Sequence, residues 1–246
     1  MRLALFADIH ANATALEAVL AHAGRQNISR HVFLGDLVGY GPDPVEVCTR
    51  VADFVAAGAI AVMGNHDEAA VTGTGQMNPT AAAAIAWTHQ KLRPADRDFL
   101  SRLPMTAEVE DVLLVHAEAS RPGAWNYVTN REEAGVSLRK TAQRVTFCGH
   151  VHKPALYYAA AGGTPSSHVP AAGMEVPLTG PRQWLMVCGA VGQPRDGNPA
   201  ACYTVYDTAT RLMTMHRVPY DTEGVAARIR AEGLPESLAV RLTKGL

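Results

Sequence analysis

Three short apolar segments, separated by segments with helical spacing, constrain the fold most strongly. They span residues 3–7, 31–34 and 59–62, and each has the length and composition of a buried strand. Between them, Asn12 can cap one helix and Pro44 suits the first turn of a second. This alternation predicts a parallel sheet with right-handed crossovers. In such a sheet, ligands bind beyond the carboxyl ends of the strands.

The rest of the chain continues the alternation of helices and strands. Helical segments are expected over residues 79–103, with a break at Pro94, and over residues 222–242; strands are expected at residues 107–115 (as a hairpin), 145–148, 156–159, 184–188, 202–206 and 212–216. The late strands predict a second sheet that is more antiparallel than the first. Residues 162–180 are rich in Gly, Pro and Ser and predict an exposed, mobile connection. We therefore expect an α/β sandwich of two mixed sheets flanked by helices, in a single domain over residues 1–246.

Composition excludes several classes of protein. Apolar residues make up 48% of the chain, charged residues 18%, and the formal net charge is −1 without a long basic run. Binding of nucleic acid through a broad basic face is therefore not favoured, although folding could still form a local basic patch. The first apolar run is interrupted by Asp8 and His10, so it is not a signal peptide, and no apolar stretch reaches the roughly 18 residues of a membrane span. The cysteines lie beside apolar runs without C-x-x-C spacing, which predicts buried free thiols in a cytoplasmic protein; they are Cys48, Cys148, Cys188 and Cys202.

Polar residues with metal-binding side chains follow the predicted strands. The motifs are Asp8-Ile9-His10, Gly35-Asp36, Gly64-Asn65-His66-Asp67, His116 and Gly149-His150-Val151-His152. Because the carboxyl ends of parallel strands meet at one edge of a sheet, the motifs after the first three strands are expected to lie together there. D-x-H and G-D alone are weak signals, whereas G-N-H-[DE] is more specific and G-H-x-H moderately so. Their joint occurrence in this order, each directly after a strand, favours a metal site.

The donor atoms in these motifs predict two metals. Carboxylate and amide oxygens and imidazole nitrogens are ligands for Mn, Fe, Zn or Ni. In an extended segment, alternating residues such as Asp8 and His10, or His150 and His152, point the same way, so each pair is expected to hold one metal together. The ligands are too many for one tetrahedral zinc. Two metals about 3.5–4 Å apart, sharing one carboxylate, would use them all.

The motifs D-x-H, G-D, G-N-H-[DE], a lone His and G-H-x-H together resemble the calcineurin-like metallophosphoesterase superfamily. The chain is most similar to its small single-domain bacterial and archaeal phosphodiesterase branch, in which runs such as Gly39-Tyr40-Gly41-Pro42 also occur. Residues 192–199 also resemble that branch, and the resemblance extends over residues 8–207. It implies the metallophosphoesterase type of α/β sandwich.

The resemblance also implies a role for each motif residue. One metal would be held by Asp8, His10 and His152, the other by Asn65, His116 and His150, with Asp36 bridging the two. A hydroxide between the metals would attack phosphorus. His66 would donate a proton to the leaving oxygen or stabilise its charge, and Asp67 would orient His66. The implied cofactors are two divalent ions, Mn, Fe, Zn or Ni, with Mn favoured.

The chain departs from the family pattern at two places. Ala11 replaces the Gly that follows the first His in small enzymes, which removes no ligand. Gly39 and Tyr40 stand where protein serine/threonine phosphatases carry an Asp-Arg pair that orients the catalytic His and holds phosphate, so a protein phosphatase is disfavoured. Four further residues have a functional role as the alternative to ordinary packing: Arg195 could contact phosphate, Tyr40 could form a wall of the pocket, and Trp87 and Trp125 could line the substrate entrance.

The expected activity is hydrolysis of a phosphodiester, with a small or nucleotide-like phosphoester as the substrate, because the chain lacks room for a large cap domain. A phosphomonoesterase, a diadenosine-polyphosphate-type hydrolase and a nuclease remain alternatives with related chemistry. A non-catalytic scaffold of the same fold, which binds proteins, is the alternative from another class. Such relatives lose the catalytic His or metal ligands, whereas His66 and every expected ligand are present here.

Overall fold

The computed structural model describes residues 1–75, 77–160 and 162–246. Its strands are β1 (Arg2–Phe6), β2 (Arg30–Phe33), β3 (Ile60–Ala61), β4 (Thr106–Val109), β5 (Val112–Val115), β6 (Val145–Cys148), β7 (Ala155–Ala160), β8 (Ser166–His168), β9 (Glu175–Pro177), β10 (Arg182–Val187), β11 (Ala201–Asp207) and β12 (Leu212–Val218). They form two six-stranded sheets, with the order β3-β2-β1-β11-β12-β9 in the first and β4-β5-β6-β10-β7-β8 in the second. Each sheet contains parallel and antiparallel pairs. The predicted α/β sandwich of two mixed sheets is confirmed.

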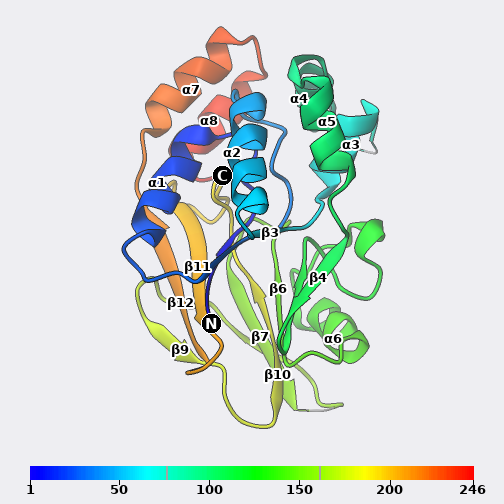
Figure 1. Cartoon of the computed structure of the whole chain (residues 1–246), viewed down its shortest axis with the longest axis vertical. Helices are drawn as coiled ribbons and strands as arrows, with labels where there is room; N and C mark the ends of the chain where they lie inside the picture. The colour runs from blue at the N-terminus through cyan, green and yellow to red at the C-terminus, as the bar shows by residue number, and fades with distance from the viewer. Residues whose placement is uncertain (76, 161) are drawn as a thin grey trace.

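Helices flank the two sheets, mostly at one end (Figure 1). They are α1 (Ala13–Ala23), α2 (Pro44–Ala56), α3 (Asn65–Thr72), α4 (Pro79–Lys91), α5 (Pro94–Ser101), α6 (Arg131–Lys140), α7 (Thr222–Ala231) and α8 (Glu236–Lys244), with a short 3-10 turn, η1 (Pro122–Ala124). All but α6 gather at the upper end of the view, and the first strand, β1, runs toward that end (Figure 1). The ends of the strands that carry the polar motifs therefore lie under the helices.

The first half of the chain follows the predicted alternation closely. β1, β2 and β3 are parallel neighbours joined through α1 and α2. The Asn12 side chain caps α1 by accepting a hydrogen bond from the Ala15 amide (3.0 Å), and Pro44 is the first residue of α2. Pro94 likewise begins α5. The residues at the first turn, Asn12, Pro44 and Pro94, thus determine where these helices begin.

Two helices were not predicted. α3 begins directly at Asn65, and its eight residues are too few to show a clear apolar period. Its start is stabilised by Asp67, whose carboxylate accepts a hydrogen bond from the Gly64 amide (3.0 Å). α6 is capped by Asn130, which accepts from the Glu133 amide (2.9 Å). Its buried face is made largely of small residues, Ala134, Gly135 and Ser137, so the apolar pattern is faint.

The prediction for the late strands was partly wrong. β7 and β10 lie in the second sheet as expected, but β11 and β12 belong to the first, where β11 pairs antiparallel with β1. A run of buried apolar residues predicts a strand but does not specify its neighbour. The open edge of β1 opposite β2 supplies the hydrogen-bonding partner for β11.

Residues 162–180 are mostly exposed, as expected, but they are not a plain connection. They contain β8, which is an edge strand of the second sheet, and β9, which is an edge strand of the first. The expected helical end is divided into α7 and α8, because Gly233 adopts a left-handed conformation (φ 70°) that ends the first helix.

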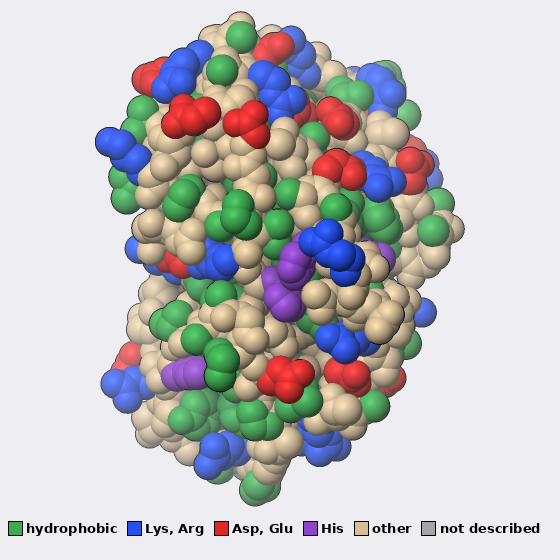
Figure 2. Space-filling view, turned by 90° about the vertical axis from the view of Figure 1, so that its left-hand side faces the viewer, with side chains coloured by type: hydrophobic (Ala, Val, Ile, Leu, Met, Phe, Trp, Pro, Cys, Tyr) green, Lys and Arg blue, Asp and Glu red, His purple; other side chains and the backbone are tan. Residues whose placement is uncertain are grey.

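The core lies in two main apolar clusters, one between the sheets and one between the first sheet and its helices. All four cysteines are buried free thiols, as predicted. Within the described ranges, no helix is long and apolar enough to cross a membrane. On the face shown in Figure 2, acidic and basic side chains are interspersed rather than gathered into one basic surface.

Candidate metal centre

The polar motifs of both sheets meet at one place in the fold. Asp8 and His10 follow β1, Asp36 follows β2 and Asn65 begins the helix after β3. From the second sheet, His116 follows β5, and His150 and His152 follow β6. All of these side chains except Asn65 are buried. The structure brings together every residue that the sequence assigned to the metal site.

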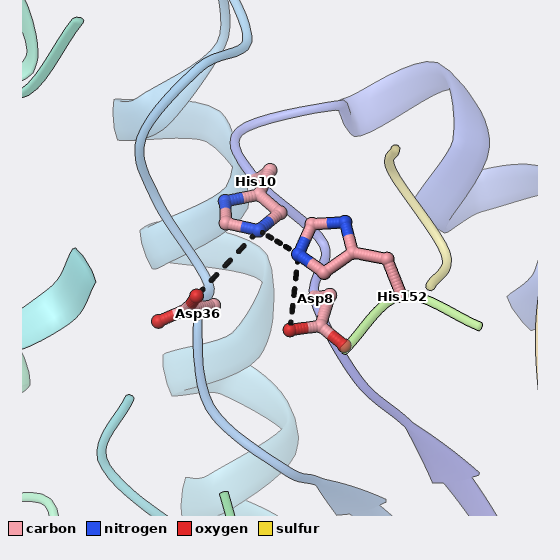
Figure 3. Close-up of side chains that lie close together, drawn as sticks. All are labelled: Asp8, His10, Asp36 and His152. Carbon is pink, nitrogen blue, oxygen red and sulfur yellow. Dashed lines mark hydrogen bonds and ion pairs between the residues drawn. The ribbon is translucent and has the colours of Figure 1, made fainter. Parts of the chain in front are cut away.

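The first donor group consists of Asp8, His10, Asp36 and His152, whose donor atoms lie within 4.8 Å of one another (Figure 3). His10 Nε2 is 3.0 Å from His152 Nε2 and 3.5 Å from Asp36 Oδ2. His152 Nε2 is 3.6 Å from Asp8 Oδ1. These four side chains converge on a common point from three loops.

The second donor group consists of Asp36, His116 and His150, again within 4.8 Å of one another. His116 Nε2 is 3.2 Å from His150 Nδ1 and 3.4 Å from Asp36 Oδ1. Asn65 joins this group, because its Oδ1 atom is 3.2 Å from His116 Nε2. Asp36 therefore belongs to both groups, with Oδ2 facing the first and Oδ1 facing the second.

Backbone carbonyls fix the imidazole tautomers in the first group so that lone pairs face one another. His10 Nδ1 donates to the Val38 carbonyl (3.2 Å), and His152 Nδ1 donates to the Gln193 carbonyl (2.7 Å). Burial holds the pKa of both imidazoles well below the usual value, so both rings are neutral. A neutral imidazole that donates from Nδ1 has a lone pair at Nε2. Two such lone pairs 3.0 Å apart, next to carboxylates, fit a shared cation.

The second group has the same electron-rich character. His150 Nε2 donates to the Trp125 carbonyl (2.9 Å), and burial lowers the pKa of this ring to about 3, so Nδ1 offers a lone pair. Burial alone would lower the pKa of His116, yet the charge of Asp36, its hydrogen bond to the ring, the charge of Asp8 and the Leu34 carbonyl together outweigh burial and raise that pKa to about 9. The group therefore stabilises a positive charge, which is the property that a cation site requires.

The carboxylates at the centre have histidines beside them but no Lys or Arg partner among the described residues. Asp8 is 0% exposed and Asp36 is 1% exposed, and among the described residues neither forms an ion pair with Lys or Arg. Burial raises the pKa of Asp8 to about 7. Burial also opposes ionisation of Asp36, but the charges of His116, His66 and His10 and the hydrogen bond from His116 together outweigh it and hold the pKa of Asp36 well below the usual value. Bound divalent ions would satisfy both carboxylates.

The backbone at the donor residues is left-handed rather than extended. The φ angles are 54° at Asp8, 48° at His10, 69° at His150 and 64° at His152. His150 and His152 nevertheless join different donor groups, so the expectation that they hold one metal together was wrong, whereas Asp8 and His10 share a group. The division implied by the family resemblance agrees with the structure. Such backbone costs about 1–3 kcal/mol per residue and is typical of functional sites.

Gly64 is required by the close approach of two loops. A Cβ atom at this position would lie 2.2 Å from both the amide nitrogen and Oδ1 of Asp36. The glycine of the G-N-H-D motif thus lets the loop after β3 pass directly over the shared carboxylate. The amide of His66, two residues after Gly64, then donates to Asp36 Oδ1 (2.8 Å).

His66 is buried beside the first donor group without being part of it. Its ring lies 4.8 Å from that of His10 and 4.4 Å from that of Tyr40. Its Nδ1 atom has no hydrogen-bonding partner among the described residues. Burial lowers the pKa of the ring. A Cβ atom on Gly39, whose φ is 87°, would lie 2.5 Å from this Nδ1, so the fold has no room here for the Asp of the Asp-Arg pair.

The family resemblance implied that Asp67 orients His66, but the Asp67 carboxylate does not hydrogen-bond to the His66 ring. Its carboxylate accepts from the amides of Leu37 (2.8 Å), Val38 (3.2 Å) and Gly64 (3.0 Å). It therefore ties the loop after β2 to the start of α3. Any influence of Asp67 on His66 is exerted through the backbone.

Arg195 extends over the wall of the centre. Its guanidinium lies 5.5 Å from the centroid of the Tyr40 ring, and Nη2 donates to Gln193 Oε1 (2.8 Å). The Arg195 amide also donates to the carbonyl of His152 (3.2 Å). Tyr40 and Arg195 thus both lie against the first donor group, where the alternative roles considered for them would place them.

Several participants were not identified from the sequence. The carbonyls that orient the imidazoles belong to Leu34, Val38, Trp125 and Gln193, and backbone acceptors leave no mark in the residue types. Tyr127, which stacks on the His150 ring at 4.1 Å, was also missed. Its only sequence signal is its position two residues after Trp125.

Two buried donor groups that share one carboxylate, at the strand ends of a two-sheet sandwich, define a dinuclear metal-dependent phosphoesterase. Residues 1–211 match the family model of the calcineurin-like phosphoesterase superfamily domain, and the chain belongs to this superfamily. Its members depend on two metal ions, and the two donor groups are the candidate sites for them.

Known relatives extend over the whole chain. A crystal structure of a metallophosphoesterase from Sphaerobacter thermophilus is 35% identical, covers 100% of this chain and 99% of that chain, and superposes with a TM-score of 0.88. An uncharacterized protein of Methanocaldococcus jannaschii is 30% identical over 249 residues, covering 99% of this chain and 98% of its own. A hypothetical protein from Pyrococcus horikoshii shares 18% identity with a TM-score of 0.81, covering 100% and 98% of the two chains, and shows the common fold.

Proposed function

We propose that the protein hydrolyses phosphodiester bonds of small or nucleotide-like substrates with two divalent ions, of which Mn is favoured. The observation that carries the proposal is the pair of buried donor groups joined through the two oxygens of Asp36. The first ion would be held by Asp8, His10 and His152, and the second by Asn65, His116 and His150. Such ions neutralise phosphoryl charge and lower the pKa of a bound water.

The protein groups around the centre have distinct tasks in this proposal. The carbonyls of Val38, Gln193 and Trp125 hold the imidazoles with their lone pairs inward. His66 lies next to the centre without joining either group, so it is free to donate a hydrogen bond or a proton to the leaving oxygen. Asp67 supports it by fixing the start of α3.

We also propose that the whole chain, residues 1–246, acts as one domain. α7 and α8 pack on Tyr40, and the Tyr40 ring lies against His10 and His66. The last helices thus support the wall of the metal centre. This contact couples the end of the chain to the loop after β2.

A panel of phosphoesters tests the activity. We expect the Mn-loaded protein to hydrolyse bis-p-nitrophenyl phosphate, a diester, with a higher kcat/KM than p-nitrophenyl phosphate, a monoester. Chelation should abolish both activities, and added Mn should restore them. A higher kcat/KM for the monoester would make the protein a phosphomonoesterase. Activity that is indifferent to chelation would refute the metal-based proposal.

A further inference from the structure

A cavity of about 470 Å³ adjoins the second donor group. Asn65 and His150, two of the candidate ligands, form its wall toward the metal centre. Trp125 and Tyr127 line it as well, together with Glu68 from α3. A volume of this size accommodates a nucleoside-sized group. Because two candidate ligands line the cavity, a group bound there would be attached to the phosphorus under attack.

The two aromatic side chains are held in place by the candidate ligands. The Tyr127 ring stacks on the His150 ring with centroids 4.1 Å apart and an angle of 12°, while 51% of Tyr127 remains exposed. Trp125 has a left-handed backbone (φ 53°), which lets its carbonyl accept from His150 Nε2. Its indole Nε1 donates to Glu68 Oε2 (3.0 Å). The cavity therefore has a fixed aromatic wall whose position is set by the metal centre.

The charge of the lining restricts what can bind. No Lys or Arg appears among the described residues that line the cavity, and Glu68 contributes a carboxylate. A second phosphate would be repelled there, as it would find an acidic group and no cation. A polar aromatic group is favoured instead, because it can stack on the rings and donate an N–H to Glu68 Oε1, the carboxylate oxygen that Trp125 does not use.

We propose that this cavity is the nucleoside subsite of the enzyme: the base stacks on Tyr127 and Trp125, and an N–H of the base donates to Glu68. The proposal rests on the phosphodiesterase function proposed above. It places the nucleoside, the uncharged part of the substrate, on the side of the metal centre that the second donor group forms. It also disfavours substrates that would place a polyphosphate chain in this cavity.

Two esters with the same leaving group isolate the subsite. They are the p-nitrophenyl ester of thymidine 5′-phosphate and p-nitrophenyl ethyl phosphate. We expect the Mn-loaded protein to show a kcat/KM roughly 10–100-fold higher for the nucleotide ester, since stacking of one base has an effect of that size. Tyr127→Leu should lower the ratio of kcat/KM for the nucleotide ester to that for the ethyl ester about tenfold, chiefly through a higher KM for the nucleotide ester. Tyr127→Phe, which keeps the ring, should retain the preference.

Tyr158→Leu is the matched control, because Tyr158 is a partly buried tyrosine that packs on Trp184 in β10 and lies outside the cavity. It should leave the ratio of the two esters unchanged. Metal content is measured in each variant, so that a loss of metal is not mistaken for a loss of stacking.

Equilibrium binding decides the subsite independently of turnover. Calorimetric titration of the Mn-loaded protein should show tighter binding of thymidine 5′-monophosphate than of ethyl phosphate, with the difference lost in Tyr127→Leu. Equal affinities in the unaltered protein, or equal losses for both ligands in Tyr127→Leu at full metal content, would overturn the subsite. Hydrolysis of the ethyl ester with equal affinities would leave the phosphodiesterase function standing and remove only the subsite. If nucleotide binding is preferred but neither ester is hydrolysed, the subsite stands and the proposed reaction fails.

Discussion

Asp36 is the residue on which the two donor groups depend jointly. Its two oxygens face different groups, whereas Asp8, His10 and His152 serve only the first and His116 and His150 only the second. A change at Asp36 should therefore act on both sites at once. A change at a terminal ligand should act mainly on one.

Replacement of the shared carboxylate tests this division. Asp36→Asn should lower the occupancy of both ions, because one negative charge near both is lost. His152→Ala should chiefly lower the occupancy of the ion held with Asp8 and His10. Anomalous scattering from Mn-soaked crystals measures each occupancy. Wild-type occupancy of both sites in Asp36→Asn would contradict the bridging role.

His66 is expected to act on the leaving group rather than on the metals. His66→Ala should keep both ions and lower kcat by roughly 10²–10⁴-fold for a diester with an alkoxide leaving group, which needs a proton. The loss should be smaller for a nitrophenyl ester, whose leaving oxygen carries its charge more easily. The measurement is kcat for both substrates together with metal content. Equal losses at full metal content would reduce His66 to a positioning residue.

At the scale of elements, the C-terminal helices close the site from the side of the first donor group. Tyr40 is 6% exposed, and the apolar cluster around it is formed mainly by α7 and α8. The family model ends at residue 211, so these two helices lie beyond the matched part of the chain. They nevertheless pack on the loop that carries Tyr40 and supports His66.

A substitution that creates a cavity in this apolar cluster should destabilise the fold. Leu238 is fully buried, and Leu238→Ala removes side-chain volume under Tyr40, at a cost of roughly 2–5 kcal/mol in the free energy of unfolding. Leu246→Ala is the matched control, since Leu246 is 57% exposed and its loss should change stability by less than about 0.5 kcal/mol. Urea unfolding of both variants measures the difference. Equal midpoints would show that the C-terminal helices contribute little to the core.

At the scale of the whole molecule, the metal centre joins the two sheets. Asp8, His10, Asp36 and Asn65 come from loops of the first sheet, whereas His116, His150 and His152 come from loops of the second. The His150 amide also donates across this boundary to both oxygens of Asp8 (3.0 Å each). Ions held between the groups would cross-link the sandwich.

Metal binding should therefore stabilise the entire fold. An ion present at about a hundred times its dissociation constant adds about 2.7 kcal/mol, if the unfolded chain does not bind it. For a chain of this size, that corresponds to a Tm higher by roughly 5–10 °C. Scanning calorimetry with Mn and with chelator measures the shift, and Asp36→Asn should show a smaller one. An unchanged Tm in the unaltered protein would argue against a cross-linking role.

The sequence by itself determined which residues form the candidate site. Strand ends, helix caps and the order of strands depend on local patterns, so Asp8, Asp36 and Asn65 could be assigned to one sheet edge, and Asn12 and Pro44 to helix starts. The types of the donor atoms specified a metal site before the geometry was known. The tertiary structure then brought these residues together as expected.

Only the tertiary structure decided how the donors are shared and what lies beside them. His150 and His152 join different groups whereas Asp8 and His10 share one, although all four have a left-handed backbone, because the grouping depends on how the loops pack rather than on residue type. The partner of β11, the carbonyls that fix the imidazoles and the cavity lined by Trp125 and Tyr127 likewise arise from contacts between distant segments. A local pattern carries no information about such contacts, because they depend on where the folded chain places its backbone.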